Sequence, residues 1–259
     1  MRIVLVRPNY ESHIITPPLG LGYLASYLKQ HKIDVRIIDG LRDNLSPAKI
    51  VEQILSFKPD AVGITCLTSF YHQVVDLSLA LKVKKPEIKC IIGGIHPTFL
   101  PYETLADSKA DFIVCGEGEG ALLKLIKANF SNKGIRGVYS QKDALERKVI
   151  KKAEIIEDLD NLPFPDWEQI DPSSYPKAPH GAVVNHFPVG IIISSRGCPY
   201  PCTYCASPGF CERKIRFRSP ENVVDEIIFL HREYGVKEIH FEDDNLTMKR
   251  SHIQKICEL

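Results

Sequence analysis

The sequence predicts an α/β protein: a five-stranded, doubly wound parallel sheet followed by the first βα units of an incomplete (β/α) barrel. From residue 1 to about 130, short β-branched runs alternate with helical patterns. A shorter alternation of the same kind begins near residue 189, after a proline-rich stretch. We therefore expect a Rossmann-like domain at 1–133, a hairpin and proline-rich linker at 134–188, and the N-terminal part of a barrel at 189–259.

The pattern of the first segment defines its elements. The expected strands are residues 2–6, 35–38, 61–65, 90–92 and 112–115. The expected helices are residues 19–30, 47–57, 71–83 and 119–128, with a weaker one near 102–106. Ser46 followed by Pro47 is typical of a helix start. Since ligands of such sheets bind beyond the carboxyl ends of the strands, we expect a site in the loops there.

The later elements follow the same reasoning. Residues 138–140 and 148–152 are expected to pair as a small hairpin. Five prolines then predict a stiff, extended segment: Pro163, Pro165, Pro172, Pro176 and Pro179. Beyond them, we expect strands at 189–194 and 237–241, a helix at 220–234 between them, and a further helix from Met248.

Composition excludes some classes of protein. The 33 Lys and Arg residues nearly balance 32 Asp and Glu residues, which gives no electrostatic reason to expect a nucleic acid partner. No apolar run approaches the length of a membrane span, and the N-terminus does not resemble a signal peptide. Without a secretory signal, the eight cysteines are expected to be reduced thiols in a cytoplasmic protein.

The most chemically specific segment holds Cys198, Cys202 and Cys205, spaced C-x3-C-x2-C. Three thiolates can fill three corners of a cubane iron–sulfur cluster and leave one iron open to react. A structural zinc site would need a fourth ligand, such as Cys211 or a histidine. The spacing therefore favours a cluster and leaves zinc as an alternative.

A second motif points to a different cofactor. Residues 20–25 match G-x-G-x-x-A, and Asp39 lies where a ribose-binding acid of a dinucleotide site is expected. That fingerprint must follow its strand immediately, whereas about a dozen residues intervene here. We expect instead that Gly20 and Gly22 let the first helix pack close to the sheet.

These segments together resemble one enzyme family. The cysteine loop, with Tyr204 before its last cysteine, resembles the cluster loop of radical S-adenosylmethionine enzymes. Residues 93–97 and 116–119 resemble the cobalamin-binding domain that precedes the radical domain in one branch of that superfamily. Residues 162–165 and 241–247 are also similar to that branch.

The resemblance implies a 4Fe-4S cluster held by the three cysteines, with S-adenosylmethionine on its open iron. One electron would then cleave S-adenosylmethionine to a deoxyadenosyl radical. Tyr204 would lie near the adenine, and three acids would hold the methionine ammonium group: Glu242, Asp243 and Asp244. The branch typically methylates unactivated carbon, with cobalamin as methyl carrier.

The implied cobalamin contacts lie in the loops that follow the strands: Thr65, Leu67, Gly93, Gly94, His96, Gly116 and Glu117. Related domains that bind cobalt through a histidine carry D-x-H-x-x-G after the first strand. Here that loop reads Glu11-Ser12-His13 and lacks the glycine. We therefore favour a solvated His13 over a cobalt ligand.

Alternatives remain at this stage. A radical methylthiotransferase, which acts on RNA, would need a second cluster from Cys66, Cys90 and Cys115. Cys90 begins its strand at the opposite edge, so we expect three buried apolar thiols. Cys211 and Cys257 are expected to be spare thiols. A cobalamin-binding module without catalysis and a zinc-stabilised α/β protein are the other two alternatives.

The barrel is expected to be incomplete. About 70 residues after Gly190 supply two βα units, at about 30 residues each, whereas a radical enzyme's partial barrel has six. We expect an unpaired edge on the strand ending at Phe241, and more cobalamin binding than catalysis from these residues alone. The expected partners are a small-molecule, natural-product or lipid substrate and an electron donor such as flavodoxin or ferredoxin.

Overall fold

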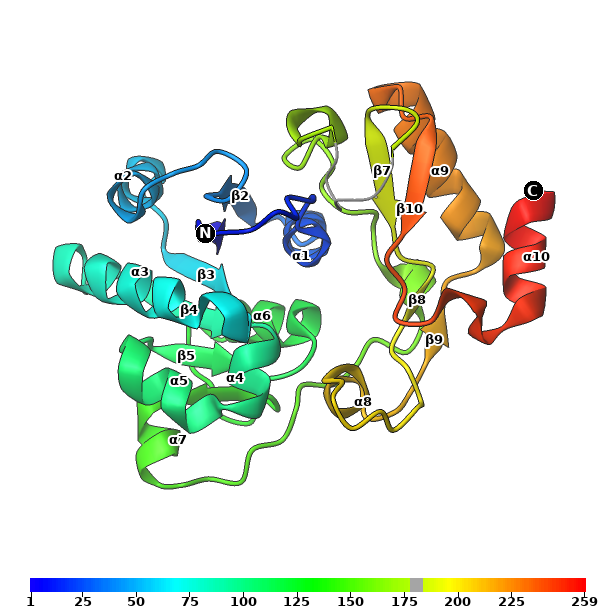
Figure 1. Ribbon diagram of the computed structural model, residues 1–259. Coiled ribbons are helices and arrows are strands. Elements are labelled where there is room, and N and C mark those ends of the chain that lie inside the picture. The colour runs from blue at the N-terminus through cyan, green and yellow to red at the C-terminus, as the bar shows by residue number, and fades with distance from the viewer. Residues whose placement is uncertain (178–183) are drawn as a thin grey trace. The chain divides into compact units, whose positions relative to one another are not determined.

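The computed structural model describes residues 1–177 and 184–259, so Pro179 lies outside the described residues. The chain folds into two compact units (Figure 1). Residues 1–11 and 20–156 form the first unit, and residues 12–19 and 157–259 form the second. The division after residue 156 falls within the predicted linker.

The first unit is built on a six-stranded sheet in the order β2-β1-β3-β4-β5-β6. Its strands are β1 (Arg2–Arg7), β2 (Asp34–Asp39), β3 (Ala61–Thr65), β4 (Lys89–Gly93), β5 (Phe112–Val114) and β6 (Val138–Ser140). The first five strands pair in parallel, as the sequence predicts. The strand order reverses between β1 and β3, and ligands of open α/β sheets bind at such a switch point.

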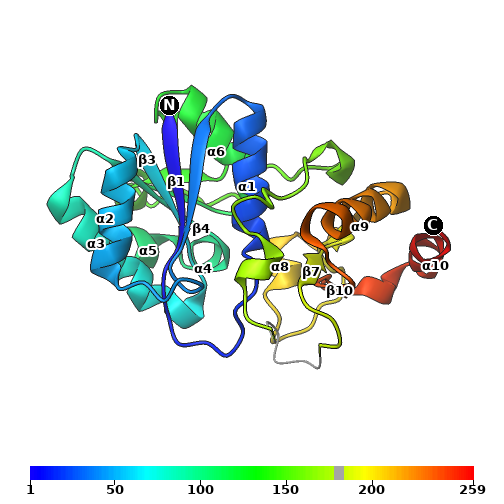
Figure 2. The same ribbon diagram turned by 90° about the horizontal axis from the view of Figure 1, so that it is seen from above.

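The helices of this unit lie on both faces of the sheet (Figure 2). They are α1 (Leu19–Gln30), α2 (Pro47–Phe57), α3 (Tyr71–Lys84), α4 (Ile95–Phe99), α5 (Pro101–Ser108), α6 (Gly118–Lys127) and α7 (Gln141–Leu145). A 3-10 turn, η1 (Thr68–Phe70), precedes α3. The predicted start of α2 is confirmed, because the Ser46 side chain accepts a hydrogen bond from the Lys49 N–H and Pro47 follows it.

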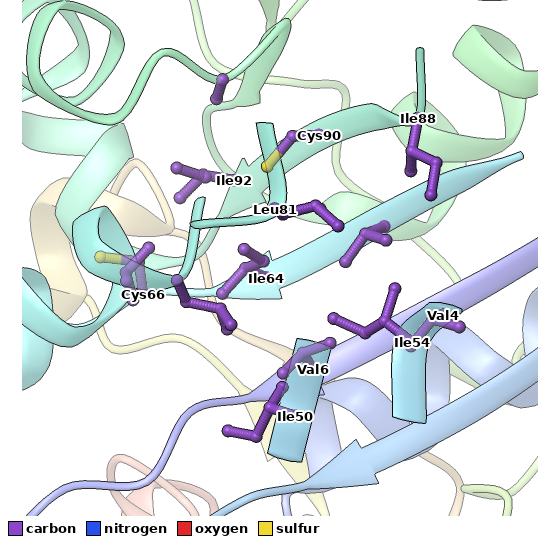
Figure 3. Packing of buried hydrophobic residues seen from close by; sticks show 14 of the residues in the cluster. Val4, Val6, Ile50, Ile54, Ile64, Cys66, Leu81, Ile88, Cys90 and Ile92 are labelled. Carbon is purple, nitrogen blue, oxygen red and sulfur yellow. The ribbon is translucent and has the colours of Figure 1, made fainter. Parts of the chain in front are cut away.

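The hydrophobic core of the first unit has two halves because successive strand residues point to opposite faces. Val4 and Val6 of β1 pack with α2 residues such as Ile50 and Ile54 (Figure 3). Ile3 and Leu5, which alternate with them, pack in the other half, together with residues of α1 and α6. The sheet is thus buried on both faces, and its functional groups are left at the strand ends.

The predicted hairpin is wrong. Residues 138–140 form β6, which pairs antiparallel with β5, and residues 148–152 are not a strand. Residues 138–140 pair with the edge of β5, which lies farther away in the sequence than residues 148–152. Residues 148–152 are held instead by contacts such as the Lys151 N–H bond to the Tyr139 hydroxyl oxygen.

Close packing does not explain Gly20, contrary to the expectation from the sequence, while the same expectation for Gly22 stays a prediction. An added Cβ on Gly20 would have no atom within 4 Å, so this glycine does not serve close packing. The dinucleotide alternative gains no support, because residues 8–18 separate β1 from α1. Asp39 is fully buried and accepts hydrogen bonds from the Arg7 guanidinium at 2.8 Å and 2.6 Å.

The second unit contains two short sheets. β7 (Val189–Ile192) and β10 (Glu238–Phe241) pair in parallel, and β8 (Ser195–Arg196) pairs antiparallel with β9 (Arg216–Phe217). Its helices are α8 (Ser207–Phe210), α9 (Pro220–Tyr234) and α10 (Arg250–Glu258). Among the described residues, β10 pairs only with β7. No described helix of the chain is long and apolar enough to cross a membrane.

The proline-rich segment is packed rather than extended. It contains the 3-10 turns η2 (Leu159–Asn161) and η3 (Pro172–Ser174), each preceded by an aspartate whose side chain accepts a nearby N–H. The buried Trp167 donates its indole N–H to Glu226 of α9 at 2.9 Å. Arg218 donates to the other oxygen of Glu226 and to the Ile193 carbonyl, so this segment is tied to the end of β7.

Candidate functional site

The three predicted cluster cysteines lie on one loop of the second unit. The loop, residues 197–215, connects β8 to β9, and the antiparallel pairs Ser195–Phe217 and Arg196–Arg216 close its base. β8 follows the carboxyl end of β7 after two residues. The predicted strand over 189–194 is therefore shorter than expected, and the loop begins from a separate two-stranded ribbon.

The thiols differ in exposure. Cys202 and Cys205 are exposed, and Cys198 is half-buried. The Cys205 N–H donates to the Cys202 carbonyl at 3.2 Å, and Tyr204 is 91% exposed. In residues 1–177 and 184–259, no three metal-ligating side chains are gathered into a binding arrangement. The cluster ligands therefore stay a prediction, supported by three thiols on one short loop, which is the donor chemistry that iron–sulfur clusters require.

Gly197 fixes the path of the backbone into this loop. Its φ of +96° lies in the left-handed region that favours glycine. An added Cβ would lie 2.1 Å from the Lys214 carbonyl oxygen and 3.0 Å from the Cys211 sulfur. Glycine is required here because the two sides of the loop touch at this residue.

Cys211 is not a spare thiol, contrary to the expectation from the sequence. It is buried, its Sγ accepts the Cys198 N–H at 3.4 Å, and its thiol donates to the Ser207 carbonyl at 2.9 Å. A side chain held on the inner side of the loop is not presented together with the exposed thiols of Cys202 and Cys205. This position argues against Cys211 as the fourth ligand of a zinc site.

The three acids after β10 have different surroundings. Asp243 accepts hydrogen bonds from the Ser194 N–H, the Ser194 hydroxyl and the Ser195 hydroxyl, and so joins β10 to the end of β7. Asp244 accepts from the Ser207 hydroxyl at 2.6 Å. Burial raises the pKa of Glu242 despite the charge of His240 nearby. All three lie on one loop, and their contact with S-adenosylmethionine stays a prediction.

The first unit brings the predicted cobalamin contacts together at the carboxyl edge of its sheet. The loops after β3, β4 and β5 are joined by hydrogen bonds: Cys66 N–H to the Gly93 carbonyl, His96 N–H to the Cys66 carbonyl, and Gly116 N–H to the Thr98 hydroxyl. Thr65 pairs with Gly93 in the β3–β4 register, and the Leu67 side chain is 38% exposed. These loops form one continuous edge, which places the predicted residues side by side.

The backbone and its packing require a glycine at position 94 but not at position 93. Gly94 has a φ of +110°, and an added Cβ would lie 2.7 Å from the Cys66 carbonyl oxygen, so the fold itself requires it. An added Cβ on Gly93 would make only ordinary contact with Val114 at 3.9 Å. Packing therefore does not explain Gly93, and its contact with cobalamin stays a prediction.

His96 is the most distinctive side chain at this edge. It is buried and stacks on Tyr71, with ring centroids 3.9 Å apart, and its Nδ1 is 3.1 Å from the Thr68 hydroxyl. Its Nε2 is buried without a hydrogen-bond partner among the described residues. Burial lowers the pKa of His96 and so favours the neutral imidazole. A buried polar atom of this kind needs a partner, and a bound ligand could supply one.

Other candidate residues have structural roles or solvent contact. Gly116, with a φ of +92°, would place a Cβ 3.1 Å from Lys152, so its backbone requires glycine. The Glu117 carboxylate accepts the Ile156 N–H at 3.1 Å. His13 is exposed, which agrees with the solvated histidine expected there.

The expected burial of three further cysteines is confirmed. Cys66, Cys90 and Cys115 are each fully buried, and Cys66 and Cys115 follow the carboxyl ends of their strands while Cys90 lies near the start of β4. Burial raises the pKa of Cys66 and Cys115 to about 12, and that of Cys90 to about 11. Such thiols stay protonated at neutral pH, which does not favour a second cluster.

Sequence reasoning missed the residues that support these sites. Thr68 contacts His96, Thr98 holds the loop after β5, and Cys211 holds the Cys198 backbone within the cysteine loop. Cys211 carried one usable signal, since it lies only six residues beyond Cys205 in the same loop. The threonines carried none, because their partners are distant in the sequence.

Two family models match the chain. Residues 10–126 match the B12 binding domain, and residues 192–259 match the radical SAM superfamily. The first range contains all the predicted cobalamin contacts, and the second contains the cysteine loop and the three acids. Both matches agree with the cofactors expected from the sequence: cobalamin, S-adenosylmethionine and a 4Fe-4S cluster.

Curated relatives match nearly the whole chain. An uncharacterized methyltransferase of Pyrococcus horikoshii is 34% identical over 96% of this chain and 55% of its own length. The cytidylyl-2-hydroxyethylphosphonate methyltransferase of Streptomyces wedmorensis is 31% identical over 98% of this chain and 57% of its own. The anaerobic magnesium-protoporphyrin IX monomethyl ester cyclase of Cereibacter sphaeroides is 35% identical, over the full chain and 43% of its own length. The chain thus spans about half the length of these relatives.

Solved structures share the fold. The radical S-adenosylmethionine methyltransferase TsrM of Kitasatospora setae has a TM-score of 0.78 at 18% identity, over 99% of this chain and 50% of TsrM. The cobalamin-dependent S-adenosylmethionine radical enzyme OxsB has a TM-score of 0.74 at 21% identity, over 99% of this chain and 36% of OxsB. The predicted fold class is confirmed: a doubly wound first domain followed by the first units of a radical SAM barrel.

Proposed function

The chain belongs to the radical S-adenosylmethionine enzymes that carry an N-terminal B12 binding domain, and we propose that it is the front part of a cobalamin-dependent radical methyltransferase. Its reaction is the transfer of a methyl group to an unactivated centre of a small molecule. The observation that carries the proposal is the loop between β8 and β9, which holds Cys198, Cys202 and Cys205. In the chain, this loop comes after a sheet edge that is built like a cofactor site.

In this proposal, the three thiolates hold a 4Fe-4S cluster, and Tyr204 and the acids after β10 orient S-adenosylmethionine. When bound, the cluster supplies one electron, which splits S-adenosylmethionine into methionine and a deoxyadenosyl radical, and cobalamin carries the methyl group. The protein's own contribution is binding and orientation. Glu242, whose pKa is raised by burial, lies beside Asp243 and Asp244 on the loop that follows β10, so an ammonium group bound there would meet three acidic residues in sequence.

The first unit supports the cobalamin part of the proposal. His96 presents an unpartnered buried nitrogen among the described residues, and Gly93 is small for no packing reason. Thr65, Leu67, Gly94, Gly116 and Glu117 lie on the same hydrogen-bonded loops. These features fit a large, flat ligand held mainly by backbone, without a cobalt ligand from His13.

Anaerobic reconstitution tests the proposal. The purified chain is incubated with iron, sulfide and hydroxocobalamin, and iron, sulfide, zinc and cobalt are then measured per chain with absorption spectra. We expect about four irons per chain, as a 4Fe-4S cluster requires, together with one cobalamin. The Cys198→Ala, Cys202→Ala, Cys205→Ala triple variant should lose the iron and keep the cobalamin, whereas the Cys257→Ala control should keep both, because Cys257 is exposed on α10.

The outcomes separate the alternatives. Cobalamin without iron would support a binding module, and stoichiometric zinc would contradict both readings. A second cluster bound through Cys66, Cys90 and Cys115 would favour the RNA methylthiotransferase. The named relatives include both methyltransferases and a cyclase, so product analysis with the full-length protein decides between methyl transfer and another radical reaction.

The remaining parts of the proposal concern partners. A flavodoxin or ferredoxin in the cytoplasm would supply the electron, and no nucleic acid partner is expected. Relatives named for a cytidylyl phosphonate and a magnesium porphyrin ester support a small-molecule or natural-product substrate. A lipid substrate stays an expectation from the sequence. We expect little or no deoxyadenosine from the 259 residues alone, as a deoxyadenosine assay would show.

A further inference from the structure

Cys211 belongs to the same loop as the three predicted cluster ligands, and its buried side chain contacts the backbone of Cys198. It is 5% exposed, and its Sγ accepts a hydrogen bond from the backbone N–H of Cys198 at 3.4 Å. Its own thiol donates to the Ser207 carbonyl at 2.9 Å. The sulfur therefore both donates and accepts, which satisfies a backbone donor of the first ligand residue.

The same sulfur lies at the point where the loop is most crowded. An added Cβ on Gly197 would lie 3.0 Å from the Cys211 Sγ, so the residue before the first ligand packs on this side chain. The Lys214 N–H donates to the Cys211 carbonyl, and the Lys214 carbonyl faces Gly197 at the other side of the same crossing. Cys211 thus contacts both ends of the loop: residues 197–198 where the loop begins, and Lys214 where it ends.

The contact extends to the acidic loop after β10. Ser207, whose carbonyl accepts from Cys211, donates its hydroxyl to Asp244 at 2.6 Å. A continuous series of contacts then runs from Asp244 through Ser207 and Cys211 to the backbone of Cys198. It connects the loop proposed to bind S-adenosylmethionine with the loop proposed to bind iron.

We propose that Cys211 is a positioning residue for the cluster: it is not an iron ligand, and its thiol fixes the backbone of Cys198 so that this ligand meets the iron in a defined orientation. The inference rests on the proposed function, because it presupposes a cluster on Cys198, Cys202 and Cys205. Groups that orient metal ligands typically change metal affinity by about 10-fold to 100-fold when they are removed.

Two substitutions of Cys211 test the proposal against a matched control. Cys211→Ser keeps a side chain that can donate and accept, Cys211→Ala removes both bonds, and Cys257→Ser changes an exposed cysteine of α10. We expect Cys211→Ala to bind iron about 10-fold more weakly than the wild type. Cys211→Ser should bind most of the wild-type amount of iron, but the EPR spectrum and midpoint potential of its reduced cluster should be shifted. Cys257→Ser should match the wild type in iron content, EPR spectrum and midpoint potential.

If Cys211→Ala fails to fold, the hydrogen bond from the Cys198 N–H to Cys211 can still be tested by hydrogen exchange in the wild-type apoprotein. Hydrogen exchange should show the Cys198 amide protected well below its random-coil exchange rate, and Cys211→Ser should retain part of that protection. A wild-type Cys198 amide that exchanges at the random-coil rate would overturn the proposal.

The iron measurements give two further ways to overturn it. Cys211→Ala with wild-type iron and an unchanged EPR spectrum would show that the thiol has no positioning role. Cys211→Ser as poor in iron as Cys211→Ala would indicate that the sulfur itself binds the metal. Failure of the proposed function looks different, because the wild type and Cys257→Ser would then take up no iron either.

Discussion

The two candidate cofactor sites are built on opposite plans. At the sheet edge of the first unit, His96 is 2% exposed and is held by stacking and a hydrogen bond. On the cysteine loop of the second unit, Cys202 and Cys205 are exposed and Tyr204 is 91% exposed, while the buried groups lie at the base of the loop. The fold holds the His96 side chain in the first site. In the second site it holds only the base of the loop and leaves the predicted ligands Cys202 and Cys205 exposed.

Both plans nevertheless depend on a left-handed glycine beside a backbone carbonyl. Gly94 lies against Cys66, and Gly197 lies against Lys214. One glycine fixes the loop backbone in each unit. The two candidate sites therefore differ in the exposure of their side chains, since His96 is buried whereas Cys202 and Cys205 are exposed. Substitution of either glycine should therefore damage the site in its own unit through the backbone, whereas substitution of a candidate side chain should leave the loop backbone intact.

Gly197→Ala is expected to have the largest effect. The added Cβ would lie 2.1 Å from the Lys214 carbonyl oxygen at a φ of +96°, which we expect to cost about 3 kcal/mol or more. Iron uptake after reconstitution should be lost, while cobalamin binding by the first unit persists. Gly20→Ala is the control, because it meets no atom within 4 Å in α1 and should stabilise by up to about 1 kcal/mol. Normal iron in Gly197→Ala would contradict the loop geometry.

The variants Gly94→Ala and Gly93→Ala separate the structural role of one glycine from the proposed ligand-binding role of the other. Gly94→Ala should destabilise the first unit by about 1–3 kcal/mol, because of its φ and the contact with Cys66. Gly93→Ala should leave stability within about 0.5 kcal/mol and still weaken cobalamin binding. Thermal unfolding and cobalamin titration measure the two effects. Unchanged affinity in Gly93→Ala would remove close approach as the reason for this glycine.

Substitution of Asp143, which lies in α7 directly after β6, is expected to have a smaller effect on stability that depends on pH. Burial opposes its ionisation, but hydrogen bonds from Lys148, Ser140 and Asn132 outweigh burial and hold the pKa of Asp143 well below its usual range. Because the folded pKa lies below the unfolded value of about 3.9, the stabilisation is present above that pH and is lost as pH falls towards the folded pKa.

Asp143→Asn is therefore expected to lose about 2 kcal/mol of stability at neutral pH. The difference from the wild type should narrow as pH falls from about 5 to about 2, as urea unfolding at several pH values would show. A constant difference across this range would mean that the charge of Asp143 is not the stabilising feature. Asp111→Asn, at another ion-paired aspartate of the same unit, controls for a general effect of removing charge.

The smallest effect on stability is expected at Tyr204. A side chain that is 91% exposed contributes little to packing, so Tyr204→Ala should change stability by less than about 0.5 kcal/mol. Binding of S-adenosylmethionine to the reconstituted protein should weaken, because the proposed contact with adenine is lost. Calorimetric titration with Tyr200→Ala as a second exposed tyrosine control measures this, and equal affinity in the two variants would exclude the contact.

The sequence predicted the elements that depend on local pattern. The five parallel strands, the Ser46–Pro47 helix start and the helix at 220–234 all follow from periodicity and capping, and the structure contains them. The cysteine spacing likewise identified the reaction family, because that motif lies within one short loop. Local signals of this kind need no knowledge of distant partners.

What the sequence could not predict depends on long-range contacts. β6 pairs with β5 rather than with residues 148–152, and Trp167 finds Glu226 on α9, 59 residues away. The position of Cys211 beneath Cys198 depends on how the loop folds back at Gly197. These contacts decide which residues support a site, whereas the motif shows only which residues are candidates to form it.

A cluster held by Cys198, Cys202 and Cys205 alone would keep one iron free for S-adenosylmethionine. EPR spectroscopy of the reduced, reconstituted chain before and after addition of S-adenosylmethionine detects whether that iron is open. We expect the signal of a reduced 4Fe-4S cluster whose g values shift when S-adenosylmethionine binds, and no signal in the triple alanine variant. A cluster signal that S-adenosylmethionine leaves unchanged, or one that persists in the triple variant, would contradict this expectation.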